Sequence, residues 1–368
     1  MSSAGSSGGG AAAAAGPGAP KGRVDAVSVT IAVGIVVAVL MWCTRRRRRA
    51  PAPPPDGDTT SATKVVPAEI PQEEPKDEAV EEPQVVNEVV EETMTSAENN
   101  NLAFAETPRT ESLFQLMQQD DLDKVAKQVS SLDEVSAIMH KAGLETCNLI
   151  FGIDYTGSNY LQGKKTFGGK CLHDINDKIQ NPYQSVIATL GETLEPFASD
   201  GVIPAFGFGD AYTKDHSVFA LRPDAIPSGF KELLEIYNQL TPKVRLGGPT
   251  NFAPLIRQAI DIVKATQKYH ILVIVADGQV TNERATTEAI VQASRHPLSI
   301  ITVGVGDGPW DTMVEFDEKL PVRTFDNFHF VDFAKVTKDV ENPSAAFAIQ
   351  ALSEVPDQYR TIKEMNLL

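Results

Sequence analysis

Cysteine is scarce in this chain of 368 residues, which contains only Cys43, Cys147 and Cys171. Three cysteines cannot build a disulfide framework, and no two of them have the C-x-x-C spacing of a redox or zinc motif. This low count suits a reducing compartment. With only six histidines besides, the chain also lacks the roughly eight closely spaced Cys and His ligands of a cross-braced double-zinc RING module.

Positive charge is also scarce, because 33 Lys and Arg stand against 49 Asp and Glu, which gives a net charge of -16. Much of the acidic excess lies in the segment Glu69 to Glu98, which is rich in Glu, Pro and Val. Such a balance argues against non-specific binding to nucleic acid. The one strong basic cluster, Arg45 to Arg49, directly follows an apolar run and is typical of a membrane flank.

The apolar run extends from Ala26 to Cys43, carries no charge and is long enough for a transmembrane helix. Trp42 suits the membrane interface, and the arginines after it predict that the C-terminal side faces the cytosol. We therefore expect a single-pass membrane protein whose C-terminal domain is cytosolic, in a membrane that the sequence does not specify. A signal peptide and a buried helix are the alternatives, and Cys43 is either palmitoylated or a free thiol.

Composition divides the chain into segments. Residues 1–23 are rich in Gly and Ala and predict disorder, and residues 24–44 are the expected anchor. Residues 45–107 combine the basic flank with an acidic, Pro-rich linker that we also expect to be disordered. Residues 108–130 contain a candidate helix, and residues 131–368 have the mix of a single folded domain. Ser131 and Glu134 have the spacing of a helix-initiating capping box.

From residue 148 onward, apolar strand patterns alternate with amphipathic helix patterns. This order predicts an α/β fold with a doubly wound, mostly parallel sheet of the Rossmann-like kind. The run His270 to Ala276 is continuously apolar, as expected of a strand buried on both faces. The strands predicted from the pattern are residues 148–155, 202–208, 270–276, 298–305 and 324–331, and the helices are residues 182–198, 229–240, 252–266, 281–295 and 344–352.

Oxygen-bearing side chains follow two of these strands. Asp154, Thr156 and Ser158 form a D-x-T-x-S pattern on the loop after the first strand. Thr250 lies in a Gly-Pro loop before a helix, and Asp277 follows the most apolar strand. Ligands of such folds bind outside the carboxyl ends of the strands. A small set of hard oxygen ligands suits Mg²⁺ or Mn²⁺, with Ca²⁺ as a further candidate.

These residues and several motifs around them resemble the von Willebrand factor A domain of the copine family, as found in copines and in plant RING-type copine-like ubiquitin ligases. The resemblance covers residues 131–368. The motifs that carry it are Ala142-Gly143-Leu144-Glu145, Gly152 to Asn159, Asn181-Pro182-Tyr183, Phe206 to Asp210, Gly248 to Pro254, Ala276 to Thr281, Phe325 to Phe328 and Pro356 to Tyr359.

The resemblance implies a metal-ion-dependent adhesion site. Asp154, Thr156, Ser158, Thr250 and Asp277 would hold the ion directly or through water. A protein partner would then supply an acidic side chain to an open coordination position. The ion is a bridge in this mode of recognition and not a catalyst, so we expect an adaptor or scaffold in signalling rather than an enzyme, without a small-molecule substrate.

The chain departs from the family in its flanking modules. The paired lipid-binding domains of copines and the RING of the plant ligases are not found in the sequence. A role in ubiquitination through an associated ligase and a metal-free scaffold stay open as alternatives. Turn chemistry is the preferred interpretation for Asp210 and Asp307, tight turns for the glycines from Gly304 to Gly308, and a structural role for His270.

Overall fold

The computed structural model describes residues 113, 117, 121–278, 280–320 and 322–368. The predicted disordered N-terminus, the predicted membrane segment and the predicted linker, residues 1–107, lie outside the described residues. Helix α3, Leu122–Gln128, falls within the candidate helical segment 108–130.

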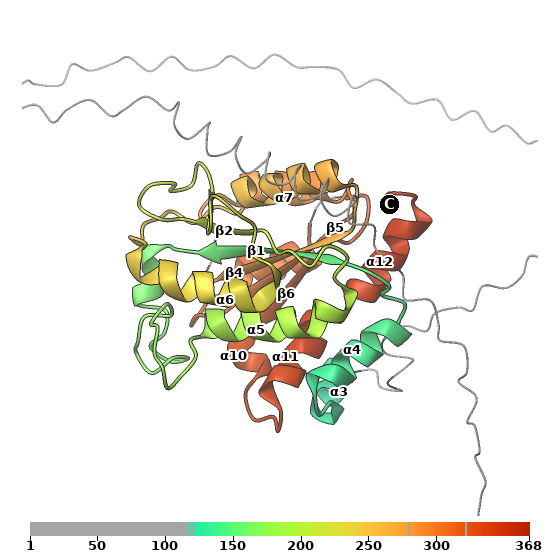
Figure 1. Ribbon diagram of the computed structural model, residues 1–368, viewed down its shortest axis with the longest axis horizontal. Helices are drawn as coiled ribbons and strands as arrows, with labels where there is room; N and C mark the ends of the chain where they lie inside the picture. Colours follow the sequence, from blue (N-terminus) through green and yellow to red (C-terminus); the bar gives the residue numbers. More distant parts are fainter. Residues whose placement is uncertain (1–112, 114–116, 118–120, 279, 321) are drawn as a thin grey trace, which may run out of the picture. The chain divides into compact units, whose positions relative to one another are not determined.

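One sheet of six strands forms the centre of the described part of the chain, in the order β3-β2-β1-β4-β5-β6. All neighbouring strands pair in parallel except β2 and β3, which pair antiparallel at one edge. The expected mostly parallel α/β sheet is therefore confirmed (Figure 1). The strands are β1 Asn148–Asp154, β2 Ala205–Phe208, β3 Phe219–Ala220, β4 His270–Ala276, β5 Leu298–Gly304 and β6 Phe328–Asp332.

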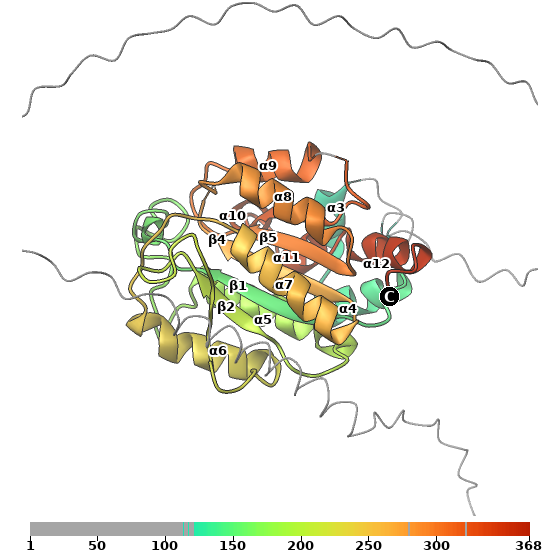
Figure 2. The ribbon, with the colours of Figure 1, turned by 90° about the horizontal axis from the view of Figure 1, so that it is seen from above.

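Helices cover both faces of this sheet. Figures 1 and 2 show α7 and α8 over one face, with α5, α6 and α11 against the other. The helices of the first face are α7 Ala253–Thr266, α8 Glu283–Ala293 and α9 Asp311–Glu318. Those that contribute to the core on the second face are α3, α4 Leu132–Lys141, α5 Pro182–Leu194, α6 Gly229–Leu240, α10 Phe333–Val336, α11 Pro343–Ala351 and α12 Val355–Glu364.

Strand alternation explains why there are two cores. Successive side chains of a strand point to opposite faces of the sheet. In β4, Ile271, Val273 and Val275 join the core under α5 and α11, whereas Leu272 and Ile274 join the core under α7 and α8. All residues of β1, β4 and β5 are buried, which explains why their sequences are mostly apolar and do not alternate with polar residues.

Helix-start signals in the sequence are largely, but not completely, realised. The Ser131 hydroxyl accepts a hydrogen bond from the Glu134 amide at 3.2 Å, so Ser131 caps α4 as predicted. The Glu134 carboxylate instead accepts from the amide and hydroxyl of Ser130, both at 2.8 Å. A complete capping box is found at α5, where Asn181 and Gln184 satisfy each other's backbone amides.

No helix among the described residues has both the length and the apolar character needed to cross a bilayer. This finding overturns the single-pass membrane localisation with a cytosolic C-terminal domain that the run Ala26 to Cys43 predicts. The apolar helices that are described owe their composition to burial against the sheet.

A close approach between β1 and α7 sets the spacing of these two elements. Gly152 lies where a Cβ atom would be 2.1 Å from Cδ2 of Leu255. Leu255 is itself fully buried, so the helix has little room to withdraw. Glycine is therefore required here by packing and not by an unusual backbone angle.

We expect Gly152→Ala to lower the free energy of unfolding by about 1–3 kcal/mol, because the added methyl group overpacks the contact with Leu255. Urea unfolding of Gly152→Ala, Leu255→Ala and the double variant measures this as a double-mutant cycle. The loss caused by Gly152→Ala should shrink in the Leu255→Ala background. An equal loss in both backgrounds would show that the helix contact is not the reason for glycine.

Candidate metal centre

The direction of the chain changes between β1 and β4. From β1 the chain passes to β2 on one side, and it later returns to β4 on the other side of β1. In open α/β sheets, ligands bind outside the carboxyl ends of the strands at such a reversal of strand order. Asp154 is the last residue of β1, and Asp277 directly follows β4. The topology thus brings the two predicted carboxylates to the same edge of the sheet.

Four of the five predicted ligands form one hydrogen-bonded chain. Oδ1 of Asp154 accepts from the Thr156 amide at 2.8 Å. The hydroxyls of Thr156 and Ser158 are 2.8 Å apart, and the Ser158 hydroxyl donates to Oδ1 of Asp277 at 3.0 Å. The D-x-T-x-S loop is therefore joined to the loop after β4 through side chains alone.

Thr250, the fifth predicted ligand, lies on a third loop that backbone hydrogen bonds hold against the other two. The Gly247 amide donates to the Tyr155 carbonyl at 3.0 Å, and the Gly157 amide donates to the Gly247 carbonyl at 2.8 Å. The Thr281 amide donates to the Thr250 carbonyl at 2.9 Å. Thr250 is 7 % exposed, and it is its backbone carbonyl, not its hydroxyl, that makes the hydrogen bond to the segment after β4.

The two carboxylates are buried with one oxygen each left without a hydrogen bond. Asp154 is 0 % and Asp277 1 % exposed, and Oδ2 of both has no partner. Burial, followed by the charge of Asp277, raises the pKa of Asp154 well above its usual range. Burial also raises the pKa of Asp277 to about 6, against the opposing effect of the Ser158 hydrogen bond. Two buried acids in contact are thus destabilised in their ionised form.

This donor set fits a hard divalent cation. Adjacent oxygen ligands of octahedral Mg²⁺ lie about 3 Å apart when each bond is about 2.1 Å long. The spacings of 2.8 Å and 3.0 Å along Thr156, Ser158 and Asp277 are close to that value. A cation would also satisfy both free carboxylate oxygens. The set contains only oxygen, which favours Mg²⁺, Mn²⁺ or Ca²⁺ over metals that prefer nitrogen or sulfur.

Below the site lies a stack of aromatic side chains that sequence reasoning did not assign. The His173 ring stacks between Tyr155 at 4.8 Å and Tyr183 at 4.1 Å, measured between ring centroids. His173 Nε2 donates to the Asp154 carbonyl at 2.7 Å, and Nδ1 accepts from the Tyr237 hydroxyl at 2.8 Å. Burial lowers the pKa of His173 to about 4, so the ring is neutral at physiological pH.

Asn159 completes this support. It is fully buried, and its amide nitrogen donates to the carbonyls of Asp154 at 3.3 Å and Thr156 at 3.1 Å. The Tyr183 hydroxyl donates to Oδ1 of Asn159 at 2.8 Å. The loop backbone is therefore fixed from below, which positions its hydroxyls. The only sign of this role in the sequence is that Asn159 directly follows the D-x-T-x-S pattern.

Of the other polar residues at strand ends, Asp210 serves a turn, as predicted, whereas Asp307 does not, because it bonds a loop more than 140 residues earlier in the sequence. Asp210 accepts from the amides of Tyr212 and Thr213 and from the Thr213 hydroxyl. Asp307 accepts from the Lys165 and Thr166 amides at 3.0–3.1 Å and from the Thr166 hydroxyl at 2.8 Å. His270 is buried and bonds the Lys268 carbonyl at 2.9 Å, which confirms its structural role.

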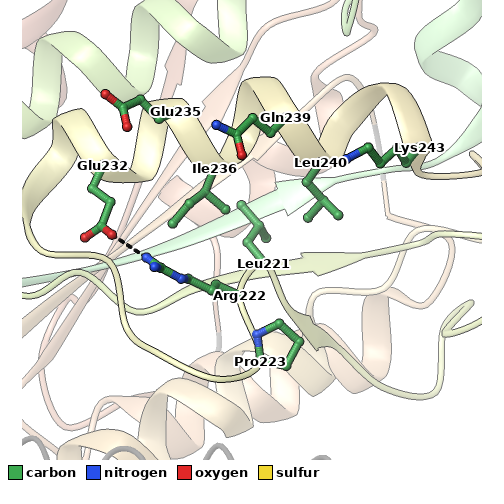
Figure 3. Close-up of a pocket in the computed structure, with 9 residues that line it drawn as sticks. All are labelled: Leu221, Arg222, Pro223, Glu232, Glu235, Ile236, Gln239, Leu240 and Lys243. Carbon is green, nitrogen blue, oxygen red and sulfur yellow. Dashed lines mark hydrogen bonds and ion pairs between the residues drawn. The ribbon is translucent and has the colours of Figure 1, made fainter.

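A separate groove of about 340 Å³ runs between α6 and the residues after β3 (Figure 3). An ion pair between Arg222 and Glu232 crosses one end of it. None of the five predicted ligands lines this groove. Its lining residues are Leu221, Arg222, Pro223, Glu232, Glu235, Ile236, Gln239, Leu240 and Lys243.

Comparison with known proteins finds copine-family proteins among the relatives of the described domain. The family model described as Copine matches residues 171–368. Copine family protein 1 of Caenorhabditis elegans is 55% identical over 261 residues, covering 70% of this chain and 24% of that protein. The E3 ubiquitin-protein ligase RGLG5 of Arabidopsis thaliana is 47% identical over 262 residues, covering 67% of this chain and 60% of that protein. The matched segment thus spans less than two thirds of either relative.

Among solved structures, the manganese-loaded TRAP protein of Plasmodium vivax is similar over 56% of this chain and 72% of that chain, with a TM-score of 0.37 and 12% sequence identity.

The buried acid pair predicts an inverted pH dependence in the metal-free protein. Because the pKa of Asp277 is about 6 in the folded state, the folded protein binds more protons than the unfolded chain between pH ~4 and ~6. The contribution of protonated Asp277 to the free energy of unfolding is therefore lost as the pH rises through this range. Asp277→Asn should remove the penalty and raise the free energy of unfolding near neutral pH by on the order of 2 kcal/mol.

Thermal unfolding in EDTA, compared at pH ~4 and pH ~7.5, measures this effect, with Asp261→Asn on the exposed side of α7 as the control. In excess Mg²⁺ the wild type should become more stable than Asp277→Asn, because only the wild type keeps both carboxylates that would bind the ion. If the wild type stays more stable than Asp277→Asn in EDTA at neutral pH, the ionised carboxylate pair does not destabilise the metal-free protein, and the prediction is wrong.

Proposed function

Because the chain belongs to the copine family, we propose that its folded domain binds a protein partner through a divalent cation held by Asp154, Thr156, Ser158, Thr250 and Asp277. The observation that carries this proposal is the pair of buried carboxylates, each with an unpartnered oxygen, joined to two hydroxyls. Mg²⁺ or Mn²⁺ fits this set best, and Ca²⁺ is the third candidate.

Each group in the site has a distinct part. Three of the five side chains offer neutral hydroxyls, so they orient an ion without cancelling its charge. The two carboxylates supply the negative charge that keeps the ion in place. The bound ion would supply positive charge and a free coordination position, which an acidic side chain of a partner can occupy. The hydrogen bonds from Asn159 and His173 hold the loop in position before the partner arrives.

Exposed apolar side chains lie on two loops next to the predicted ligands, and they indicate what flanks the acidic residue of the partner. Tyr160 and Leu161, both 61% exposed, follow Ser158 on the same loop. Tyr212, 76% exposed, lies on the loop after β2, whose backbone pairs with the residues before Gly247. Tyrosine and leucine that stay exposed near a binding site commonly contact a partner. We infer a partner segment in which an acidic residue is flanked by apolar ones.

A role in ubiquitination is a second candidate, supported by the 47% identity to a protein named as an E3 ubiquitin-protein ligase. In this version the domain recruits a protein to an associated ligase. The absence of enzymatic activity stays a prediction. Ubiquitin transfer by the purified chain with E1 and E2 enzymes, and no added ligase, would establish an enzyme in place of an adaptor.

We expect Asp154→Ala to weaken Mg²⁺ and Mn²⁺ binding at least about tenfold, because it removes a buried ligand carboxylate. Isothermal titration of the metals into the EDTA-treated full chain measures the loss. Asp261→Ala, which removes an exposed carboxylate from α7, should bind the metals like the wild type. Equal heats for Asp154→Ala and wild type would refute the metal site.

Partner binding should depend on the same residues. We expect proteins captured from lysate by the wild type in Mg²⁺ to be lost in EDTA and with Asp154→Ala, and to be retained with Asp261→Ala. Tyr212→Ala should reduce capture without changing the heat of metal binding, because Tyr212 would contact the partner and not the ion. Capture that survives EDTA would instead favour the metal-free scaffold.

A further inference from the structure

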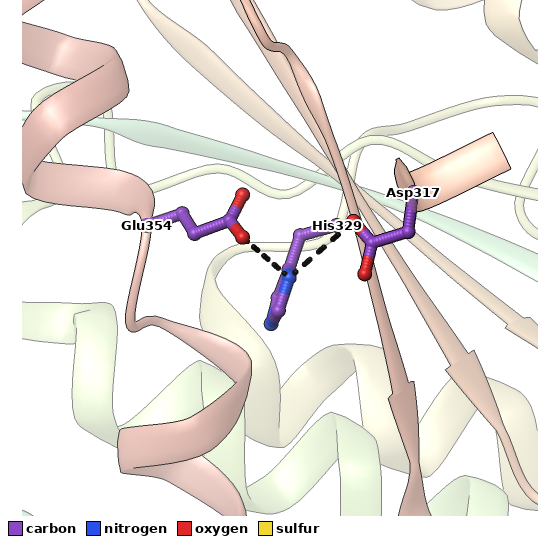
Figure 4. Close-up of side chains that lie close together, drawn as sticks. All are labelled: Asp317, His329 and Glu354. Carbon is purple, nitrogen blue, oxygen red and sulfur yellow. Dashed lines mark ion pairs between the residues drawn. The ribbon is translucent and has the colours of Figure 1, made fainter. Parts of the chain in front are cut away.

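A second group of possible metal ligands lies near the amino end of β6, away from the carboxyl edge of the sheet. It consists of Asp317 on α9, His329 on β6 and Glu354, which directly precedes α12 (Figure 4). One ligand atom from each residue lies within 4.8 Å of the others. The three side chains come from three elements, so the fold and not a local turn brings them together.

The orientation of His329 is fixed by a backbone hydrogen bond. Its Nε2 lies 3.1 Å from the Gln350 carbonyl on α11. A carbonyl oxygen only accepts, so Nε2 carries a proton and donates it. This arrangement leaves Nδ1 as the nitrogen that can bind a metal, and it is the usual way in which proteins orient a metal-binding histidine.

Nδ1 points at two carboxylates without a hydrogen bond of its own. It is buried and lacks a hydrogen-bond partner, although Glu354 Oε1 lies 3.1 Å away and Asp317 Oδ1 3.7 Å away (Figure 4). The lone pair of a neutral imidazole would repel both oxygens. A positive charge between the three atoms is therefore required, and it is either a proton on Nδ1 or a metal ion.

We propose that Asp317, His329 and Glu354 form a binding site for Zn²⁺ or a related divalent transition metal. Ligand atoms of a tetrahedral zinc site lie about 3.4 Å apart when each bond is about 2.1 Å long. The distances of 3.1 Å and 3.7 Å lie on either side of this value. Nitrogen with two carboxylates suits zinc, whereas the oxygen-only set at Asp154 suits magnesium.

The site is accessible from solvent on its carboxylate side. The side chains of Asp317 and Glu354 are 25% and 41% exposed, whereas that of His329 is 12% exposed. Water can thus fill the fourth tetrahedral position. A metal ion bound to these three side chains would link α9, the edge strand β6 and the start of α12.

A proton competes for this position. Burial lowers the pKa of His329, but the facing carboxylates of Asp317 and Glu354 raise it more, to about 10. Metal affinity should therefore fall by roughly tenfold for each pH unit below 10, because the metal must displace that proton. A divalent cation balances the two negative charges of Asp317 and Glu354, whereas an imidazolium balances only one of them.

The test uses the full chain carrying Asp154→Ala, so that the oxygen site does not contribute. The protein is stripped with EDTA, and Zn²⁺ is titrated in competition with a chromogenic chelator near pH 8 with excess Mg²⁺. We expect one bound equivalent, which His329→Gln or Asp317→Asn weakens about tenfold or more. His216→Gln is the matched control, because His216 also faces a carboxylate, Asp215 at 3.4 Å, but its side chain is 80% exposed.

Co²⁺ supplies a second readout that does not depend on stability. The parent protein should give the visible absorption of tetrahedral Co²⁺, and the Asp317→Asn/Glu354→Gln variant, which keeps the histidine, should not. Equal zinc binding by the parent, His329→Gln and His216→Gln would overturn the proposal and leave an imidazolium ion cluster. No bound equivalent in the parent would overturn it as well. Neither result bears on the Mg²⁺ site, which is removed in every variant.

Discussion

The burial of two neighbouring carboxylates, Asp154 and Asp277, is the constraint on which the rest of the site depends. Like charges removed from water repel each other and lose hydration, so the surrounding residues have to compensate or accept a cation. The Ser158 hydroxyl satisfies one oxygen of Asp277 and joins the two loops, and the Thr156 hydroxyl bonds that of Ser158. The other oxygens stay without a partner. A parallel pairing of β1 with β4 makes this juxtaposition possible, because the carboxyl ends of both strands lie at one edge of the sheet.

The two ionic clusters of the domain each bring two carboxylates close together, but they differ in the source of the positive charge that balances them. At the carboxyl edge of the sheet, two acids are accompanied by hydroxyls, and positive charge has to come from outside. At the amino end of β6, two acids face an imidazole that can itself carry the charge. In the proposed sites, the first arrangement would be neutralised by a bound cation, whereas the second is balanced by its own proton, which a metal would have to replace. Burial also differs, since Asp154 and Asp277 are almost fully enclosed while Glu354 is partly exposed.

Sequence was informative where a pattern is local and periodic. The buried strands β1, β4 and β5 could be predicted because continuous apolar runs are required of strands covered on both faces. The place of the D-x-T-x-S loop after a buried strand could also be predicted, whereas its role in holding a metal stays a prediction. Short or exposed elements were missed, such as the two-residue strand β3 and the helices α9 and α12, whose apolar faces are narrow. His173 and His329 were missed because tertiary contacts give them their roles. The membrane prediction rested on a segment outside the described residues, and no described helix supports it.

The pairing of β1 with β4 has a consequence for how the protein is made. Ser158 and Asp277 meet across 119 residues of intervening sequence. On the ribosome, the D-x-T-x-S loop emerges long before its partner strand exists. Closing so long a loop is entropically unfavourable until the sheet can form, so pairing of this kind is slow and late. The contact between Ser158 and Asp277 therefore forms only after β4 has been synthesised, so it cannot guide the folding of the segments that precede β4.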